Sequence, residues 1–477
     1  MKKSTFLIIC ALFLYVTGTK ATDVSGTVTS NTTWTAAGSP YIVVNNIEVY
    51  PGITLTIENG VEVKFNSGRY LYVRGTLNAT GVKFTGNAGV TKGFWDGIYV
   101  SYEYNEVGNV NLTNCTVEYA SNLYIRKGQL TLNNCLVNNL SGTIRIHTSQ
   151  CTLNIDNTTI SNTNFPITYY APGVINPGSN IVFSNNAYNF VDIDFSEVNE
   201  LFWLKNFGQP YFNDNSIQVR AAGTLKMDPG VNLQIQNTEI RIYGKIKAIG
   251  TKEKPVIFDK SPASSYWLGL NILNSSIDTA CIVKNAIICN ANYNYHEWYQ
   301  ALEIENASPT IDSCLFYGNA YNLHIYGDSK PVISNTVLRK SITTASEAFN
   351  LIMDMNANPT FTNDSIQFNN TEIRAIGIRE NTVSSKTARL KKINFAGINN
   401  ISYFLYNNTT VHDTASLTID PGVVIKTRYY SQLIGNGKIT AIGTDAEPIV
   451  FTHLADDTYG NPADTQNDGT QTPGVSN

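Results

Sequence analysis

Charge, cysteine and long apolar segments are all scarce in this chain, and each scarcity excludes a class of protein. Charged residues make up 15% of the 477 positions and the formal net charge is −4, which argues against nucleic-acid binding because phosphate requires a basic face. Only seven cysteines occur, and none has the Cys-x-x-Cys spacing of a structural metal site. Beyond the N-terminus no segment approaches the roughly 20 apolar residues of a membrane span.

The one apolar segment lies at the start of the chain. Lys2 and Lys3 precede an apolar run from Phe6 to Val16, and Thr19-Lys20-Ala21 follows it. This pattern is typical of a secretory signal peptide, with residues 1–21 removed on export. Six cysteines would remain, and in an exported protein they are either small core residues or disulfide partners, Cys115 with Cys135 being the candidate pair.

Two motifs occur three times each, so the chain consists of tandem modules. The first is an alternating segment that ends in Gly-Val, at Leu55–Val61, Leu225–Val231 and Leu417–Val423. The second is Gly-x-(Leu/Ile)-x-Ala-x-Gly, at Gly75–Gly81, Gly244–Gly250 and Gly437–Gly443. Alternating apolar residues interrupted by glycine predict short strands joined by turns.

A finer repeat lies inside the modules. Asn114, Asn134 and Asn157 each open a short Asn-x-x-(Val/Ile) segment, about 20 to 23 residues apart. This interval is one coil of a β-solenoid with two or three strands per rung. Asparagine suits the turn of each rung because it tolerates the left-handed conformation and its amide can bond to the next rung. We therefore predict an all-β fold, a parallel β-helix.

The repeats define the predicted domains. Residues 22–39, with Trp34, form an N-terminal cap; residues 40–209 and 210–401 form two full modules; residues 402–455 form a partial third; and residues 456–477 form an acidic linker-like tail. The Trp-x-Gly segment that follows the glycine motif at Trp95 and at Trp267 does not follow the third copy. We expect further C-terminal domains in a longer protein, because a solenoid with a bare strand edge is prone to aggregate.

These motifs resemble a known family. The Trp34 cap, the Leu-x-Ile-x-Pro-Gly-Val segments, the stretch Gly437–Thr452 and the Asn-x-x-Ile rungs are similar to exported right-handed parallel β-helix repeat proteins of the Bacteroidetes, within the pectin-lyase-like superfamily. The resemblance implies a right-handed β-helix, secreted or on the outer surface of a Gram-negative bacterium. The superfamily includes polysaccharide lyases, hydrolases and adhesins, so the fold alone does not choose a function.

The second module carries an eight-residue insertion relative to the first, at residues 292–299. Its side chains are rich in aromatic rings, which bind sugars through their faces. The predicted ligand-binding residues are Tyr293, Tyr295, His296, Trp298 and Tyr299. The alternative is that this loop packs as a cover over the solenoid. Tyr99, Tyr102 and Tyr104 alternate after Trp95, which predicts that they lie on one outward face; the alternative is the ordinary preference of tyrosine for strands.

The acidic tail resembles a calcium-binding loop. Asp464, Gln466, Asp468 and Gly469 occupy the first, third, fifth and sixth places of the Asp-x-(Asp/Asn)-x-Asp-Gly pattern, although Gln466 departs from it. The sequence therefore predicts Asp464, Gln466 and Asp468 as Ca²⁺ ligands, with a flexible linker as the alternative. No other cofactor is predicted.

For catalysis the sequence offers little. Asp192-x-Asp194 is the one acidic pair in an expected strand, and two solvated outward carboxylates are the preferred explanation. We predict no catalytic residue. The expected function is a non-catalytic secreted or cell-surface scaffold for adhesion or for binding a polysaccharide or host glycan. The alternative is a β-helix polysaccharide lyase or glycoside hydrolase.

Overall fold

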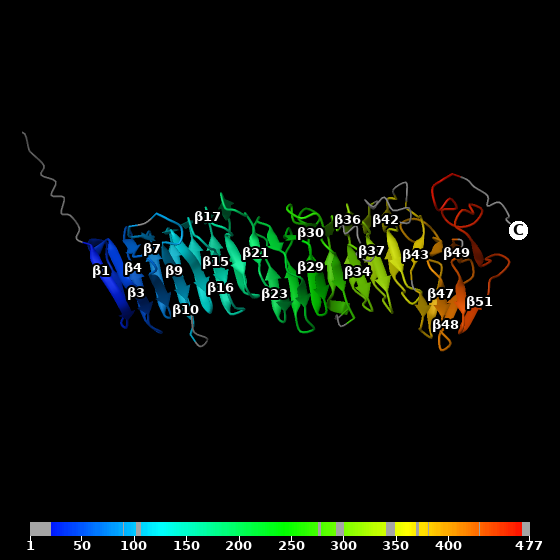
Figure 1. Cartoon of the computed structure of the whole chain (residues 1–477), viewed down its shortest axis with the longest axis horizontal. Coiled ribbons are helices and arrows are strands. Elements are labelled where there is room, and N and C mark those ends of the chain that lie inside the picture. Colours follow the sequence, from blue (N-terminus) through cyan, green and yellow to red (C-terminus); the bar gives the residue numbers. More distant parts are fainter. Residues whose placement is uncertain are drawn as a thin grey trace, which may run out of the picture.

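The chain is an all-β solenoid, as predicted: a parallel β-helix of about 17 turns, seen in a computed structural model. The structure describes residues 21–469 except 89, 102–105, 275–277, 292–299, 340–348, 369–371, 380 and 429. The predicted signal peptide, apart from Ala21, lies outside these residues. Figure 1 shows an elongated molecule in which the sequence runs from one end to the other. In the described part, no helix is long and apolar enough to cross a membrane.

The solenoid has three sections, which differ in how their strands pair. Within a section, equivalent strands of successive turns pair in parallel. We call each such series of strands a stack, and each section has three stacks. The first turns are made by β1 (Thr22–Val28), η1 (Ala36–Gly38) and the long β3 (Tyr41–Val49). Stack 1 of the first section contains β2 (Thr32–Trp34), β4 (Thr54–Ile57), β7 (Thr76–Thr80), β10 (Gly108–Thr113), β13 (Gly128–Asn133), β16 (Cys151–Asp156) and β19 (Val174–Pro177). Stack 2 contains β5 (Glu62–Phe65), β8 (Lys83–Gly86), β11 (Thr116–Glu118), β14 (Leu136–Asn138), β17 (Thr159–Ser161) and β20 (Val182–Ser184). Stack 3 contains β6 (Tyr70–Val73), β9 (Trp95–Val100), β12 (Ala120–Ile125), β15 (Ile144–Ile146), β18 (Ile167–Tyr169) and β21 (Val191–Ile193).

The second section repeats this order and includes η2 (Asp278–Ala280). Its stack 1 contains β23 (Leu201–Leu204), β26 (Thr224–Met227), β29 (Lys245–Ile249), β32 (Ile282–Lys284), β35 (Thr310–Asp312), β38 (Val332–Ser334) and β41 (Thr360–Thr362). Stack 2 contains β24 (Tyr211–Asn213), β27 (Asn232–Ile235), β30 (Val256–Lys260), β33 (Ala286–Cys289), β36 (Leu315–Tyr317), β39 (Val337–Leu338) and β42 (Ser365–Ile366). Stack 3 contains β22 (Glu197–Val198), β25 (Ile217–Val219), β28 (Ile240–Ile242), β31 (Leu270–Ile272), β34 (Leu302–Glu305), β37 (Leu323–Tyr326), β40 (Leu351–Met353) and β43 (Ile376–Ile378).

The third section is shorter. It contains β44 (Thr382–Val383), β45 (Ala388–Leu390), β46 (Tyr403–Leu405), β47 (Thr409–Val411), β48 (Ser416–Ile419), β49 (Val424–Thr427), β50 (Leu433–Gly435), β51 (Lys438–Ala441) and β52 (Val450–His453).

Alternation of side chains along each strand builds the core. In β5, Val63 and Phe65 are fully buried, whereas Glu62 and Lys64, at the alternate positions, face outward. Val63 pairs in parallel with Phe84 of β8, the equivalent residue one rung along. Such apolar ladders run along the inside of the solenoid, so most of its buried residues belong to one continuous core.

The predicted asparagine ladder is confirmed. Asn114, Asn134 and Asn157 have φ of 54°, 53° and 43°, in the left-handed region that asparagine tolerates better than most residues. The Asn157 side-chain amide donates to the Asn134 Oδ1 atom at 2.8 Å, and Asn134 donates in turn to Asn114. Asparagine therefore recurs at rung spacing in this chain because it forms the turns of successive rungs.

The Trp-x-Gly segments have an equally plain structural role. Trp95 and Trp267 are fully buried, and the indole nitrogen of Trp267 donates to the Cys289 carbonyl at 2.7 Å. Gly97 and Gly269, two residues later, have φ of 122° and 101°. A Cβ atom at Gly269 would lie 2.0 Å from the Gln300 carbonyl oxygen of the next rung, so only glycine fits there.

One stack continues across each boundary between sections. β21, in stack 3 of the first section, pairs with β24, in stack 2 of the second. The two-residue strand β22 follows β21 and begins a new stack 3. The same change occurs at the second junction, where β43 pairs with β46 and β44 begins a new stack. Adjacent sections therefore share a hydrogen-bonded sheet.

The described part of the tail, residues 456–469, packs on the solenoid. The Asn461 backbone N–H donates to Ser402 Oγ at 3.2 Å, and the Arg374 N–H donates to the Thr465 carbonyl at 2.8 Å. Thr465 is fully buried.

The cysteines belong to the core. Cys115 and Cys135 are buried free thiols in neighbouring rungs.

Candidate functional site

The aromatic loop expected to bind a ligand lies outside the described residues. Tyr293, Tyr295, His296, Trp298 and Tyr299 all fall within residues 292–299, so the structure tests none of them. Tyr102 and Tyr104 lie outside the described residues as well. The described surface of the solenoid carries two aromatic pockets and a cluster of carboxylates.

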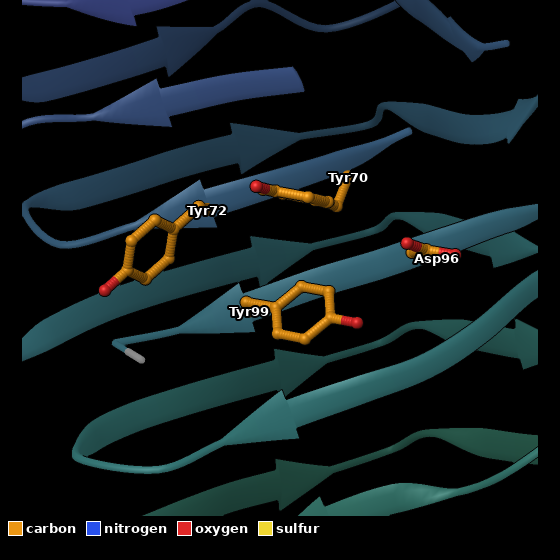
Figure 2. Close-up of a pocket in the computed structure, with 4 residues that line it drawn as sticks. All are labelled: Tyr70, Tyr72, Asp96 and Tyr99. Carbon is orange, nitrogen blue, oxygen red and sulfur yellow. The ribbon is translucent and has the colours of Figure 1, made fainter. Parts of the chain in front are cut away.

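An aromatic groove opens on stack 3 of the first section. Tyr70 and Tyr72 on β6 and Asp96 and Tyr99 on β9 line a space of about 360 Å³, and Figure 2 shows their side chains projecting from two adjacent strands. The Tyr70 and Tyr99 rings meet edge to face with their centroids 5.4 Å apart. The groove therefore combines flat apolar faces with phenol hydroxyls and a carboxylate.

The rings continue beyond the groove as a partly exposed run. The centroid of Tyr99 lies 5.5 Å from that of Tyr124 on β12, and the Tyr124 centroid lies 5.1 Å from His147. The His147 centroid lies 5.9 Å from that of Tyr170, and the Arg145 guanidinium covers the Tyr170 ring at 5.6 Å. An aromatic surface several rungs long thus follows the solenoid axis.

A carboxyl and several arginines lie in and beside the groove. Partial burial raises the pKa of the Asp96 carboxyl, and the nearby Arg69 opposes this effect. Burial, with the charges of Arg126 and Arg145, lowers the pKa of His147, so this ring is neutral at physiological pH. The run therefore combines ring faces and a neutral imidazole with the fixed charge of the Arg145 guanidinium.

A second aromatic pocket lies at the junction of the first two sections. Its space of about 340 Å³ has Phe165, Tyr188, Phe190 and Phe212 on one side. Phe165 and Tyr188 stack with centroids 5.0 Å apart and planes 14° apart, and Phe190 stacks on Phe212 at 4.5 Å. The polar and small residues that complete the lining are Asp214, Gln234, Gln236, Ser261, Pro262 and Ala263.

The two pockets lie along one register line of the shared sheet. Each residue of this line pairs with the next across neighbouring strands, and its side chain points away from the core. We call this line the outer strip; it consists of Tyr99, Tyr124, Arg145, Thr168, Asp192, Phe212 and Gln234. It is continuous only because β21 pairs with β24 at the junction.

Asp192, in the outer strip, is not the solvated carboxylate that the sequence suggested. Its strand neighbours Val191 and Ile193 point into the core, so Asp192 faces outward, yet it is only 8% exposed. Burial and the carboxylates of Asp194 and Asp214 raise its pKa to about 7. Asp194 itself is exposed and follows the strand, so the two acids do not form a matched pair on one face.

The tail brings three carboxylates together. Asp457, Asp464 and Asp468 each offer an oxygen within 4.8 Å of the others, so two of the predicted Ca²⁺ ligands, Asp464 and Asp468, meet there. The Asp464 carboxylate also accepts the N–H groups of Asp468 and Gly469, at 3.1 Å and 3.2 Å. The carboxylates therefore have the chemistry for Ca²⁺, although their arrangement owes much to the local backbone.

A buried lysine competes for this negative charge. Lys426 is fully buried, and its ammonium donates to the carbonyls of Asp456 at 3.0 Å and Ala463 at 2.7 Å. Burial lowers its pKa, while the surrounding aspartates, Asp457 foremost, oppose that change. A cation bound here would meet a cluster that is already partly neutralised.

A polar cluster on stack 3 of the second section was missed by sequence reasoning. Arg241, Asn271, Glu303 and His324 pair in register across four strands. Glu239 accepts from Asn271 at 2.9 Å and from Arg241 at 2.7 Å.

Glu303 is the glutamate of this cluster whose pKa is raised. Burial, with the charges of Glu239 and Glu305, raises the pKa of Glu303 to about 8. Glu305 lies two residues along the same strand and lines an open pocket with Tyr243. A carboxyl that is protonated at neutral pH, beside other carboxylates, is one arrangement used in acid–base chemistry.

These groupings could not be found from the sequence, because each member comes from a different rung. The signal that was available is the repeat itself, since Tyr72, Tyr99 and Tyr124 recur at rung spacing. Comparison of the chain with protein-family models, with curated proteins and with solved structures gives no match in any of the three.

Proposed function

We propose that this protein is a non-catalytic carbohydrate-binding β-helix scaffold, secreted or displayed on a bacterial cell surface, of the pectin-lyase-like kind. The observation that carries the proposal is the aromatic groove formed by Tyr70, Tyr72, Tyr99 and Asp96. Sugar rings present C–H faces to aromatic rings and hydroxyls to polar groups, and the groove supplies both.

The duplication within the chain argues that these tyrosines serve more than the fold. Tyr99 follows Trp95 by four residues, and Asn271 follows Trp267 by four, so the two occupy the same place in the repeat. The corresponding positions of stack 3 are tyrosine at successive rungs in the first section, but Arg241, Asn271 and Glu303 in the second section's own stack 3. The repeat forms an equivalent strand in both sections, so the strand does not require an aromatic residue here.

The charge of the two aromatic pockets suggests the class of glycan. Among the residues that the structure describes, Asp96 is the charged residue lining the first pocket and Asp214 the one lining the second. Carboxylates accept hydrogen bonds from sugar hydroxyls but repel the carboxylates of a polyuronide. The proposed ligand is therefore a neutral polysaccharide.

The test is binding of the mature protein to a panel of galactomannan, xyloglucan, mixed-linkage β-glucan and polygalacturonate, by affinity electrophoresis and calorimetry. We expect at least one neutral polymer to bind and polygalacturonate to bind more weakly. Tyr99→Ala should weaken binding roughly fivefold to tenfold, which corresponds to about 1 kcal/mol. Tyr430→Ala is the matched control, because Tyr430 is 92% exposed and lies in the third section. No binding to any polymer would refute the proposal.

A second candidate, a polysaccharide lyase or glycoside hydrolase, is favoured by one observation. Glu303, with its raised pKa, lies beside Glu239 and Glu305 next to an open pocket. The same panel, assayed for new reducing ends and for unsaturated products, distinguishes the two functions. Turnover that is lost in Glu303→Gln would establish the enzyme; no turnover, with binding retained, supports the scaffold.

A further inference from the structure

The two aromatic pockets lie on the same side of one sheet. Tyr99 in the first pocket and Phe212 in the second belong to the outer strip, five strand-to-strand steps apart along β9, β12, β15, β18, β21 and β24. At about 4.8 Å per step, the separation is roughly 24 Å along the solenoid axis.

The surface between the pockets has the same chemistry as the pockets. The rings of Tyr124, His147 and Tyr170 follow Tyr99, and Phe165 begins the cluster of the second pocket. Arg145 adds a guanidinium between them, whereas Thr168 and Asp192, the next residues in register, are covered by the surrounding chain. A ligand leaving the first pocket therefore meets the rings of the aromatic run and the Arg145 guanidinium, and passes over the covered part of the strip to reach the second pocket.

The second pocket is not required by the fold, because the equivalent place at the next junction is filled. Tyr403-Phe404 repeats Tyr211-Phe212, and Phe404 is fully buried. Its ring stacks on Phe349 at 5.5 Å, and Leu454 belongs to the same apolar cluster. At the first junction, Phe212 instead lines a space of about 340 Å³.

We propose that a single linear neutral glycan chain lies along the outer strip and occupies both aromatic pockets at once. This inference rests on the proposed function and deepens it: the ligand is a polymer segment longer than the interval between the pockets, bound parallel to the solenoid axis. Joining two weak pockets through one chain makes the second contact intramolecular, so affinity rises without a new kind of contact.

The test uses oligosaccharides, from disaccharide to decasaccharide, prepared from the neutral polymer that binds best in the panel. Calorimetry with the mature protein should give two short chains per protein but one long chain. The affinity should rise on the order of a hundredfold once the chain spans roughly 24 Å.

Variants at each pocket distinguish one glycan chain that spans both pockets from two chains bound independently. Tyr99→Ala and Tyr188→Ala, the latter at a side chain that is 48% exposed, should each weaken long-chain binding roughly fivefold to tenfold, because each change weakens one of the two pockets that the chain joins. Each should leave one short-chain site intact. Tyr430→Ala should change neither.

Two outcomes would overturn the inference. If long and short chains bind with equal affinity and the same stoichiometry, the pockets act independently; the proposed function then survives and the spanning chain does not. If neither short nor long chains bind, the proposed function and this inference fail together.

Discussion

Tyr99 and Asn271 occupy the same position of a duplicated module, four residues after a buried tryptophan and two after a glycine of positive φ. The surrounding framework is the same, and the outward side chain differs. Stack 3 is thus aromatic on its outer face in the first section, whereas the equivalent stack 3 of the second section is polar. This divergence on a constant scaffold is the reason to look for function on the outer face of stack 3.

The stability of the protein should depend on pH through Asp192. An aspartate in an unfolded chain has a pKa near 3.9, whereas Asp192 in the folded protein has a pKa of about 7. The folded state binds this proton more tightly, so stability should fall as the pH rises between these two values. Above the upper value, Asp192→Asn should be more stable than the native protein by about 1–4 kcal/mol.

Thermal unfolding of the two proteins across the pH range checks this prediction. Their difference should vanish at a pH below about 3, where the carboxyl is protonated in both states. Asp445→Asn, at an exposed site in the third section, is the control and should leave the pH profile unchanged. A constant difference at every pH would contradict the assignment.

The asparagine ladder should contribute measurably to stability. Asn134→Ala removes two side-chain hydrogen bonds and places alanine at φ of 53°, so we expect a loss of about 1–3 kcal/mol in the free energy of unfolding. Asn134→Gly should cost less, because glycine relieves the backbone strain. Asn133→Ala, at an exposed strand residue next to it, is the matched control. Equal losses for Asn134 and Asn133 in urea denaturation would rule out a special role of the turn.

The tail should bind Ca²⁺ weakly. Three aspartates converge there, but the Lys426 ammonium offsets part of their charge. We expect a dissociation constant on the order of 10⁻⁴–10⁻³ M by calorimetry. Asp464→Asn should abolish the heat of binding and Asp445→Asn should preserve it. No heat in the native protein would mean that Lys426 alone neutralises the cluster.

The aromatic loop remains a prediction from the sequence. Trp298→Ala should weaken binding of the neutral polysaccharide and leave the melting temperature unchanged, because a side chain that contacts a ligand adds little to the fold. A drop in melting temperature together with binding would instead identify the loop as a packed cover. Tyr430→Ala serves again as the control for a lost exposed ring.

The fold was predictable because its causes are local and repeated. The asparagines at many turns, the glycines two residues after Trp95 and Trp267, and the aliphatic residues on alternate positions act within one rung or between neighbours, and the chain repeats them. The binding surface was not predictable. Tyr99, Tyr124 and His147 come from different rungs, and each alone shows only ordinary strand propensity.

Two further features depend on contacts that no local pattern records. Asp192 is outward-facing by alternation, yet the surrounding chain covers it. The change of stack at the first junction depends on β22, a strand of two residues, Glu197–Val198. Nothing in so short a segment distinguishes it from a turn before its partner strand is known.

The pairing of β21 with β24 also determines where the molecule can be divided. Expressing one section on its own would separate two paired strands of the shared sheet. Backbone N–H and C=O groups of the remaining strand would then lack their hydrogen-bond partners. Such a fragment would be prone to aggregate through its unpaired strand edge. Dissection of this protein by deletion should therefore remove surface loops and leave the boundary between repeats intact.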